Sequence, residues 1–152
     1  MEKEKLKFAF YWAASCGGCE IAVLDVNEKI LDVVDNADIV FWPVAMDVKY
    51  KDVEAMPDKH IDVCFFNGAI RTEEQEYMAQ LLRSKAKVLV AFGSCACDGC
   101  VVGLANLWNK ERVFERAYSE TPSTKNPEGM KPETSFKAQE GELELPDFHD
   151  TV

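Results

Sequence analysis

The hydrophobic residues of the chain gather in four short runs, and polar or turn residues separate the runs. They cover residues 6–13, 37–44, 61–67 and 88–92. Each run is almost continuously apolar and too short for a helix, which is typical of strands buried on both faces of a sheet. The pattern therefore predicts four buried strands.

Between these strands the pattern changes to that of amphipathic helices. Apolar residues recur at helical spacing over residues 20–35. A second helix is predicted over residues 72–84, because glutamates follow Thr72 and lysines stand at the far end, as the helix dipole favours. Residues 45–60 read as a charged connection. This alternation predicts an α/β fold, a parallel sheet with helices on both faces.

The pattern weakens after the fourth strand. A short helix is predicted over residues 107–118, whereas residues 119–133 contain three prolines and few apolar side chains. We therefore expect one sheet domain over residues 1–118, followed by an irregular, acidic, proline-containing segment over residues 119–152.

Charge and cysteine content narrow the class of protein. The chain has 27 acidic and 17 basic side chains and a net charge of -10, which argues against nucleic acids and anionic membranes as partners. Its first five residues have mixed charge and a short apolar run follows, unlike a secretory signal or a membrane span. We expect a cytoplasmic protein. In a reducing compartment, six cysteines favour metal ligation or redox chemistry over disulfides.

Five of the six cysteines lie in two loops that directly follow predicted strands. Cys16 and Cys19 follow the first strand, and Cys95, Cys97 and Cys100 follow the fourth. Because the carboxyl ends of parallel strands meet at one edge of a sheet, both loops are expected there. The sixth, Cys64, stands inside the third strand and is predicted to be a core residue.

The spacing of the first pair leaves three chemistries open. Two cysteines separated by two residues occur in dithiol redox centres, zinc sites and iron–sulfur sites. Gly17 and Gly18, between Cys16 and Cys19, leave backbone N–H groups uncovered just before a predicted helix. A four-iron cluster is negatively charged and gains from such groups, whereas zinc has less need of them.

Two motifs together carry a resemblance to a known family. The segment Cys16-Gly-Gly-Cys-Glu20 follows a hydrophobic strand, and Gly93-Ser-Cys-Ala96 and Gly103-Leu-Ala-Asn106 follow the fourth strand. This arrangement resembles the small, electron-transferring subunit of nickel–iron hydrogenases, in particular the cytoplasmic, methyl-viologen-reducing type that does not reduce coenzyme F-420. The resemblance extends over residues 6–152.

The resemblance implies a fold, a cofactor and partners. It implies a flavodoxin-like domain that binds a proximal [4Fe–4S] cluster beside the nickel–iron centre of a separate large subunit. Electrons from dihydrogen would then pass to an iron–sulfur acceptor subunit and to a heterodisulfide reductase in an anaerobe that carries out methanogenesis. Since the chain shows no Ser/His/Asp set or phosphate-binding loop, we expect it to hold no complete active site of its own.

The resemblance also implies the site residues. Cys16, Cys19 and Cys95 would bind the cluster, and Gly17, Gly18 and Glu20 would lie against it. The family's fourth ligand stands in a Gly-Cys-Pro-Pro segment that the 152 residues lack. We therefore expect that ligand in a further C-terminal part, with Cys97 or Cys100 as the alternative. Cys100 stands where the family's motif has a glycine.

Some residues keep two interpretations. Glu20 is either an acid favoured by the helix dipole or a side chain that faces the cluster. Arg71 either offsets cluster charge or is a solvated surface arginine.

Two other functions stay open as well. One is the cluster subunit of quinone-reducing complex I, which shares the fold but has two adjacent cysteines in its first motif. The other is a redox-inactive interaction domain with zinc bound to Cys16, Cys19, Cys97 and Cys100.

Overall fold

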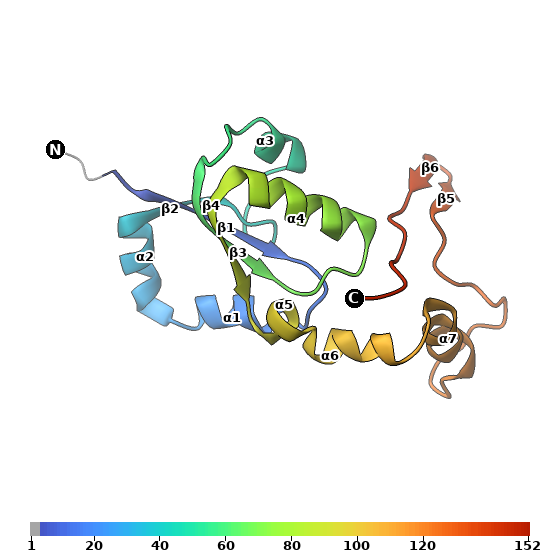
Figure 1. The fold of residues 1–152 in the computed structure, drawn as a ribbon. Coiled ribbons are helices and arrows are strands. Elements are labelled where there is room, and N and C mark those ends of the chain that lie inside the picture. Colours follow the sequence, from blue (N-terminus) through green and yellow to red (C-terminus); the bar gives the residue numbers. More distant parts are fainter. Residues whose placement is uncertain (1–3) are drawn as a thin grey trace.

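A four-stranded parallel sheet is the centre of the fold (Figure 1). The computed structural model describes residues 4–152, so the first three residues of the expected domain and of the mixed-charge start lie outside the described residues. The strands are β1 (Leu6–Trp12), β2 (Ala37–Phe41), β3 (Ile61–Asn67) and β4 (Ala86–Phe92). Their order in the sheet is β2-β1-β3-β4. The predicted α/β class is confirmed.

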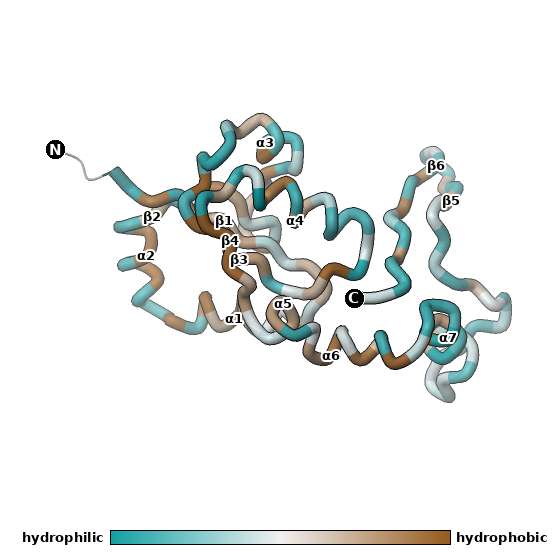
Figure 2. The backbone as a smooth tube through the Cα atoms, viewed as in Figure 1, coloured by the Kyte–Doolittle hydropathy of each residue, from teal (hydrophilic) through white to brown (hydrophobic). Residues whose placement is uncertain are grey.

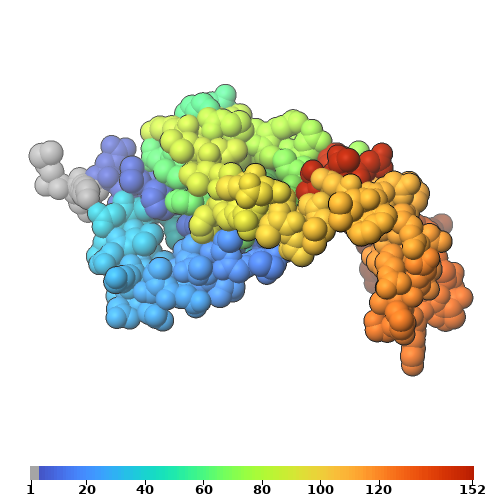
Figure 3. Space-filling model, turned by 60° about the horizontal axis from the view of Figure 1, so that its bottom comes forward, coloured from blue at the N-terminus to red at the C-terminus, as the bar shows by residue number. Residues whose placement is uncertain are grey.

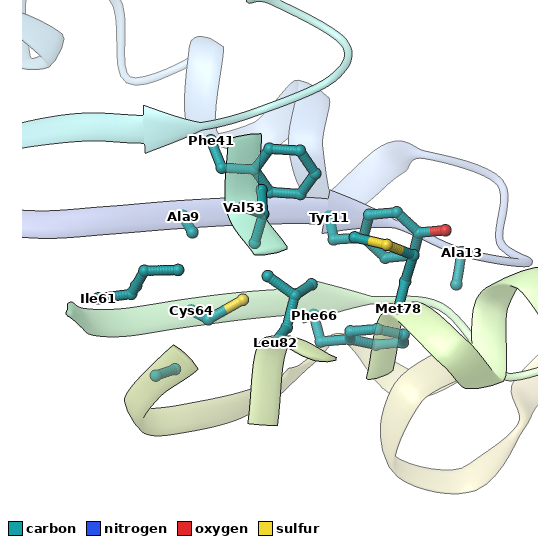
Figure 4. Packing of buried hydrophobic residues seen from close by; sticks show 11 residues of the cluster. Ala9, Tyr11, Ala13, Phe41, Val53, Ile61, Cys64, Phe66, Met78 and Leu82 are labelled. Carbon is teal, nitrogen blue, oxygen red and sulfur yellow. The ribbon is translucent and has the colours of Figure 1, made fainter. Parts of the chain in front are cut away.

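Helices lie on both sides of this sheet. Helix α3 (Tyr50–Glu54) and helix α4 (Glu73–Lys85) lie on one side, and α1 (Gly18–Leu24) and α2 (Ile30–Asn36) lie on the other (Figure 1). Buried side chains fill the space between the sheet and α4, and Figure 4 shows Cys64 among them. Cys64 is therefore the core residue that the sequence predicts. The largest fully buried apolar residues are Phe41, Ile61, Met78, Leu82 and Val53.

The first turn of α4 shows why the sequence predicts this helix well. Thr72 Oγ1 accepts a hydrogen bond from the backbone N–H of Gln75 at 3.4 Å, and Gln75 Oε1 accepts one from the backbone N–H of Thr72 at 3.2 Å. This reciprocal pair is a capping box, which satisfies donors that a helix start leaves free. Three acidic residues in the first turn and two basic residues in the last turn complement the helix dipole.

Two predicted segments differ from the structure. The expected helix over residues 20–35 is divided into α1, the 3-10 turn η1 (Asn27–Lys29) and α2. The division falls at Asn27, whose φ of 53° lies in the left-handed region that interrupts a right-handed helix. The charged connection over residues 45–60 also contains the short helix α3.

The chain after β4 is more helical than predicted. The loop with three cysteines forms α5 (Ser94–Asp98) and α6 (Cys100–Gly103), which join at Gly99 with a φ of 78°. The expected helix over residues 107–118 is replaced by shorter pieces. These are η2 (Leu104–Leu107), α7 (Lys110–Glu115) and the π-helical turn η3 (Arg116–Glu120).

The segment over residues 119–152 is not wholly irregular, in contrast to the prediction. It contains an antiparallel hairpin of β5 (Ser135–Ala138) and β6 (Gly141–Glu144), which stands apart from the main sheet (Figure 1). Figure 2 shows that hydrophobic residues concentrate in the main sheet, while hydrophilic residues are frequent around the hairpin. The end of the chain then returns to the sheet domain. Phe148 pairs with Thr72 in an isolated bridge, and its ring packs edge-on against Phe114 at 5.3 Å.

Candidate metal centre

The loop after β1 is held close to the sheet. Gly17 has a φ of 78°, and a Cβ atom at this position would lie 2.3 Å from the ring of Trp12. A side chain would therefore clash there as well as strain the backbone. Ser15 Oγ accepts a hydrogen bond from the Gly17 N–H at 3.2 Å, and α1 begins one residue later. The glycine thus lets the loop pass close to the Trp12 ring.

The loop after β4 meets the first loop at Gly93. Gly93 has a φ of 86°, and a Cβ atom on it would lie 2.2 Å from Cys19 Sγ. Only glycine leaves room for this sulfur, so the structure brings the Cys19 side chain directly over the start of the second loop. Figure 3 shows the same neighbourhood on the surface, where the segment after β1 and the segment after β4 lie side by side. Both loops lie at the carboxyl edge, as predicted.

Cys95 is the most buried of the loop cysteines, and two other cysteines are close to it. Burial raises the pKa of the Cys95 thiol, and contact with the Cys100 thiol raises it further. A hydrogen bond from the backbone of Cys16 acts in the opposite direction. The structure therefore brings Cys16, Cys95 and Cys100 together, although Cys95 lies 79 positions after Cys16 in the sequence.

Cys97 and Cys100 differ in their surroundings. Ser94 lowers the pKa of the Cys100 thiol through a side-chain hydrogen bond, and Cys100 has a φ of 43°, in the left-handed region. Cys97 Sγ instead donates to the carbonyl oxygen of Ala91 at 3.5 Å. Of the two alternative ligands, Cys100 lies nearer the other sulfurs. A cavity of 840 Å³ beside this loop is lined by Cys95, Cys97 and Cys100 but by neither Cys16 nor Cys19.

Within residues 4–152, no three His, Cys, Asp or Glu side chains converge closely enough to surround one metal ion. In a four-iron cluster each thiolate binds a different iron atom, so cluster ligands stand further apart than the ligands of one zinc ion. Whether the site fits an iron–sulfur cluster therefore depends on the groups that surround the cysteine sulfurs.

Three buried polar atoms provide a test of this fit. In the described part of the chain, the buried side-chain nitrogen and oxygen atoms without a hydrogen-bond partner are Glu20 Oε1, Asn67 Nδ2 and Arg71 Nη1. All three residues lie at the carboxyl edge of the sheet, in or beside the segments that carry the cysteines. Buried polar atoms are nearly always paired, so such a concentration indicates a place for a polar or charged group. The donors and thiols there fit an iron–sulfur cluster.

Glu20 is buried beside the first pair of cysteines. Its side chain is 2% exposed, and its Oε2 accepts a hydrogen bond from Trp42 Nε1 at 2.7 Å. Burial raises the pKa of this carboxyl, and the Trp42 hydrogen bond opposes the rise. Glu20 is therefore more than an exposed acid at a helix start.

The structure corrects the prediction for Arg71 and shows a second buried polar residue, Asn67, that the sequence pattern did not single out. The reading of Arg71 as a solvated surface arginine is wrong, because it is 8% exposed and its guanidinium lies over the Phe148 ring at 5.9 Å. The sequence also gives no role to Asn67, which is 1% exposed. A polar residue that ends the apolar run Val63–Phe66 is the signal that could have identified it.

The comparison with protein families decides the classification. Residues 16–134, which include every cysteine of the two loops, match the family described as NADH ubiquinone oxidoreductase, 20 Kd subunit. The chain belongs to this family.

Curated proteins similar to this member of the 20 Kd subunit family are hydrogenase subunits. The chain is 46% identical over 148 residues to the iron-sulfur subunit of the F420-non-reducing hydrogenase of Archaeoglobus profundus. It is 39% identical over 140 residues to a subunit of the F420-non-reducing hydrogenase of Methanothermobacter thermautotrophicus. These matches cover 97% and 92% of this chain. The resemblance to the F420-non-reducing type is confirmed.

The chain spans about half the length of these relatives, 46% and 44% respectively. A solved structure, the crystal structure of an NAD+-reducing [NiFe]-hydrogenase in the H2-reduced state, matches with a TM-score of 0.77 and 21% identity. The match covers 97% of this chain and 74% of that chain and supports the 20 Kd subunit fold. No helix in residues 4–152 has the length and apolar character needed to cross a membrane.

Proposed function

We propose that this chain is the iron–sulfur electron-transfer subunit of a soluble nickel–iron hydrogenase and binds a proximal [4Fe–4S] cluster through Cys16, Cys19 and Cys95. The observation that carries the proposal is the meeting of the two cysteine loops at Gly93, where only a glycine admits Cys19 Sγ. When bound, the cluster takes up and releases single electrons. The fourth ligand comes from outside this chain or from Cys97 or Cys100. The contact between Cys95 and Cys100 favours Cys100 over Cys97.

The residues around the sulfurs have distinct roles in this proposal. Gly18 and Gly93 keep side chains away from the sulfurs, and Gly17 lets the loop pass close to Trp12, so that backbone groups of the loops can face the cluster. Arg71 supplies a buried positive charge that offsets the negative charge of the cluster. Glu20, fixed by Trp42, faces the cluster with its free oxygen.

The proposed partners follow from the names of the relatives and from the earlier resemblance. The electron donor is the nickel–iron large subunit, which oxidises dihydrogen, so this chain needs no catalytic acid, base or nucleophile. The acceptor is an iron–sulfur subunit linked to a heterodisulfide reductase in a methanogenic anaerobe. The net charge of -10 suits a cytoplasmic complex without nucleic acid or membrane.

The test is to measure the metal content of the natural protein and to identify the subunits that purify with it. Purified without oxygen, it should show the broad visible absorbance of an iron–sulfur cluster and contain iron and acid-labile sulfide. It should also co-purify with a nickel-containing large subunit. Zinc without iron would overturn the proposal in favour of a zinc-stabilised interaction domain. Iron together with a quinone-linked membrane assembly, and no nickel, would overturn it in favour of a complex I-like subunit.

A further inference from the structure

The side-chain Nδ2 of Asn67 is a buried hydrogen-bond donor that finds no acceptor among residues 4–152. Asn67 is the last residue of β3 and pairs with Trp12 of β1 and Phe92 of β4, so it stands at the carboxyl edge in the middle of the sheet. The backbone carbonyl oxygen of Asn67 accepts a hydrogen bond from the backbone N–H of Ala13 at 2.7 Å. Its side-chain Nδ2 has no hydrogen-bond partner in the described residues. Burying an unpaired amide donor is costly. The fold therefore keeps a donor at this position that the protein itself does not satisfy.

The position of the Asn67 side chain connects it to Cys19. Gly93 lies between the two residues, since a Cβ atom on Gly93 would be 2.2 Å from Cys19 Sγ and 3.9 Å from Asn67 Oδ1. The Cys19 sulfur and the Asn67 amide thus lie around the same small space. The amide atom that faces this space is Oδ1, and a half-turn of the amide group exchanges the two ends and places the Nδ2 donor there, toward the sulfur that becomes negatively charged when it binds iron.

The other two unpartnered atoms do not fit this role. Glu20 Oε1 is an acceptor when ionised and cannot donate to a sulfur. The Arg71 guanidinium is a charged donor, and it lies over the Phe148 ring at 5.9 Å. Asn67 is therefore the neutral donor that stands next to a cysteine of the site.

We propose that Asn67 donates a hydrogen bond from Nδ2 to a sulfur of the cluster, either Cys19 Sγ or an inorganic sulfide, and thereby raises the reduction potential of the cluster. This inference rests on the proposed function. Reduction adds negative charge to the cluster, so an N–H donor stabilises the reduced form more than the oxidised form. The bond also gives the amide the acceptor that the protein does not provide.

The test compares two variants of equal shape in the natural protein, purified without oxygen with its accompanying subunits. Asn67→Thr keeps a donor on a β-branched side chain suited to a strand, and Asn67→Val replaces that hydroxyl with a methyl group. The reduction potential of the proximal cluster is measured by a redox titration that follows its paramagnetic resonance signal. Far-ultraviolet circular dichroism and iron content show whether each variant is folded and loaded.

We expect Asn67→Thr to stay near the wild-type potential and Asn67→Val to shift to a lower potential. The expected shift corresponds to about a tenfold smaller ratio of reduced to oxidised cluster at a fixed potential, about 59 mV for a one-electron couple. A folded Asn67→Val protein that loses iron while Asn67→Thr retains it would support the same bond. In the wild type, deuterium exchange should reveal an exchangeable proton coupled to the cluster that Asn67→Val lacks.

Three results would overturn the inference. The first is an unchanged potential in both loaded variants, and the second is an equal shift in both. The third is an equal loss of iron from both folded variants, because only one of them lacks a donor. A wild-type protein without any iron–sulfur signal would instead contradict the proposed function, so the two failures are distinguishable.

Discussion

Cys64 and Cys95 are both buried cysteines, yet they lie in opposite kinds of environment. Cys64, in the middle of β3, is completely buried among apolar side chains under α4 (Figure 4). Burial raises the pKa of its thiol to about 12. Cys95, in the first turn of α5, is 8% exposed but is in contact with Cys100 and with the backbone of Cys16. Burial alone therefore does not separate a structural cysteine from a functional one.

The difference between them lies in the neighbouring polar groups. Around Cys64 the fold closes with apolar packing and contains no unpartnered polar atom in the described residues. At the carboxyl edge, glycines with positive φ bring the loops together, and three buried polar atoms lack partners. The first region is satisfied by its own apolar packing, whereas the second holds buried polar atoms that find no hydrogen-bond partner among the described residues.

The largest effect is expected from adding a side chain at Gly93. In Gly93→Ala the new Cβ would meet Cys19 Sγ at 2.2 Å, so the sulfur must move and cluster binding should be lost. Gly129→Ala is the matched control, since Gly129 also has a positive φ but nothing lies within 4 Å of its Cβ position. Iron per chain after anaerobic purification measures the effect. Equal iron content in the two variants would contradict the role of Gly93.

A second prediction uses thiol reactivity to separate the two cysteines. With a pKa of about 12, Cys64 holds about a thousandfold less thiolate near neutral pH than an ordinary free thiol. We expect alkylation of the folded, cluster-free protein by iodoacetamide to leave Cys64 unmodified while the exposed Cys97 reacts. Peptide mass spectrometry gives the extent at each position. Rapid alkylation of Cys64 in the folded protein would contradict this prediction, because it would show that the reagent reaches the core.

A third prediction concerns the packing around Cys64. Leu82→Ala removes a fully buried side chain of α4 and should lower the free energy of unfolding by about 2–5 kcal/mol. The loops that carry the cysteines lie at another part of the fold, so the variant should still bind iron while it is folded. Thermal unfolding and iron analysis measure the two effects separately. A loss of iron from folded Leu82→Ala would show that the two regions are coupled.

The smallest effect is expected at the start of α4. Thr72→Ala removes the side-chain acceptor for the Gln75 N–H and should cost about 1 kcal/mol of stability. Chemical denaturation measures this difference. The exposed Thr151, which lies outside the helices and strands, provides Thr151→Ala as a control that should leave stability unchanged. A Thr72→Ala protein as stable as the wild type would mean that the cap contributes little.

Much of the fold was predictable because its signals are local. The four strands follow from continuous apolar runs, and α4 follows from its capping box and charge bias. The break at Asn27 was not predictable, since apolar residues recur at helical spacing on both sides of it and only the backbone conformation changes. The hairpin of β5 and β6 was missed because its strands have four residues each and are largely exposed.

The site was predictable in outline but not in detail. The placement of two cysteine loops after parallel strands predicts that they share one edge of the sheet. The role of Gly93 depends on its contact with a residue 74 positions earlier, which no local pattern records. The burial of Arg71 likewise depends on Phe148, far along the chain. Such long-range contacts require the structure.

The most direct test of the comparison is the iron content of two alanine variants, Cys95→Ala and Cys64→Ala, of the natural protein purified without oxygen. If Cys95 binds the proximal cluster, folded Cys95→Ala should lose about four iron atoms per chain, the content of one four-iron cluster. Cys64→Ala should keep its iron and lose only stability. Retention of the full iron content and of the proximal cluster signal in folded Cys95→Ala would contradict the account.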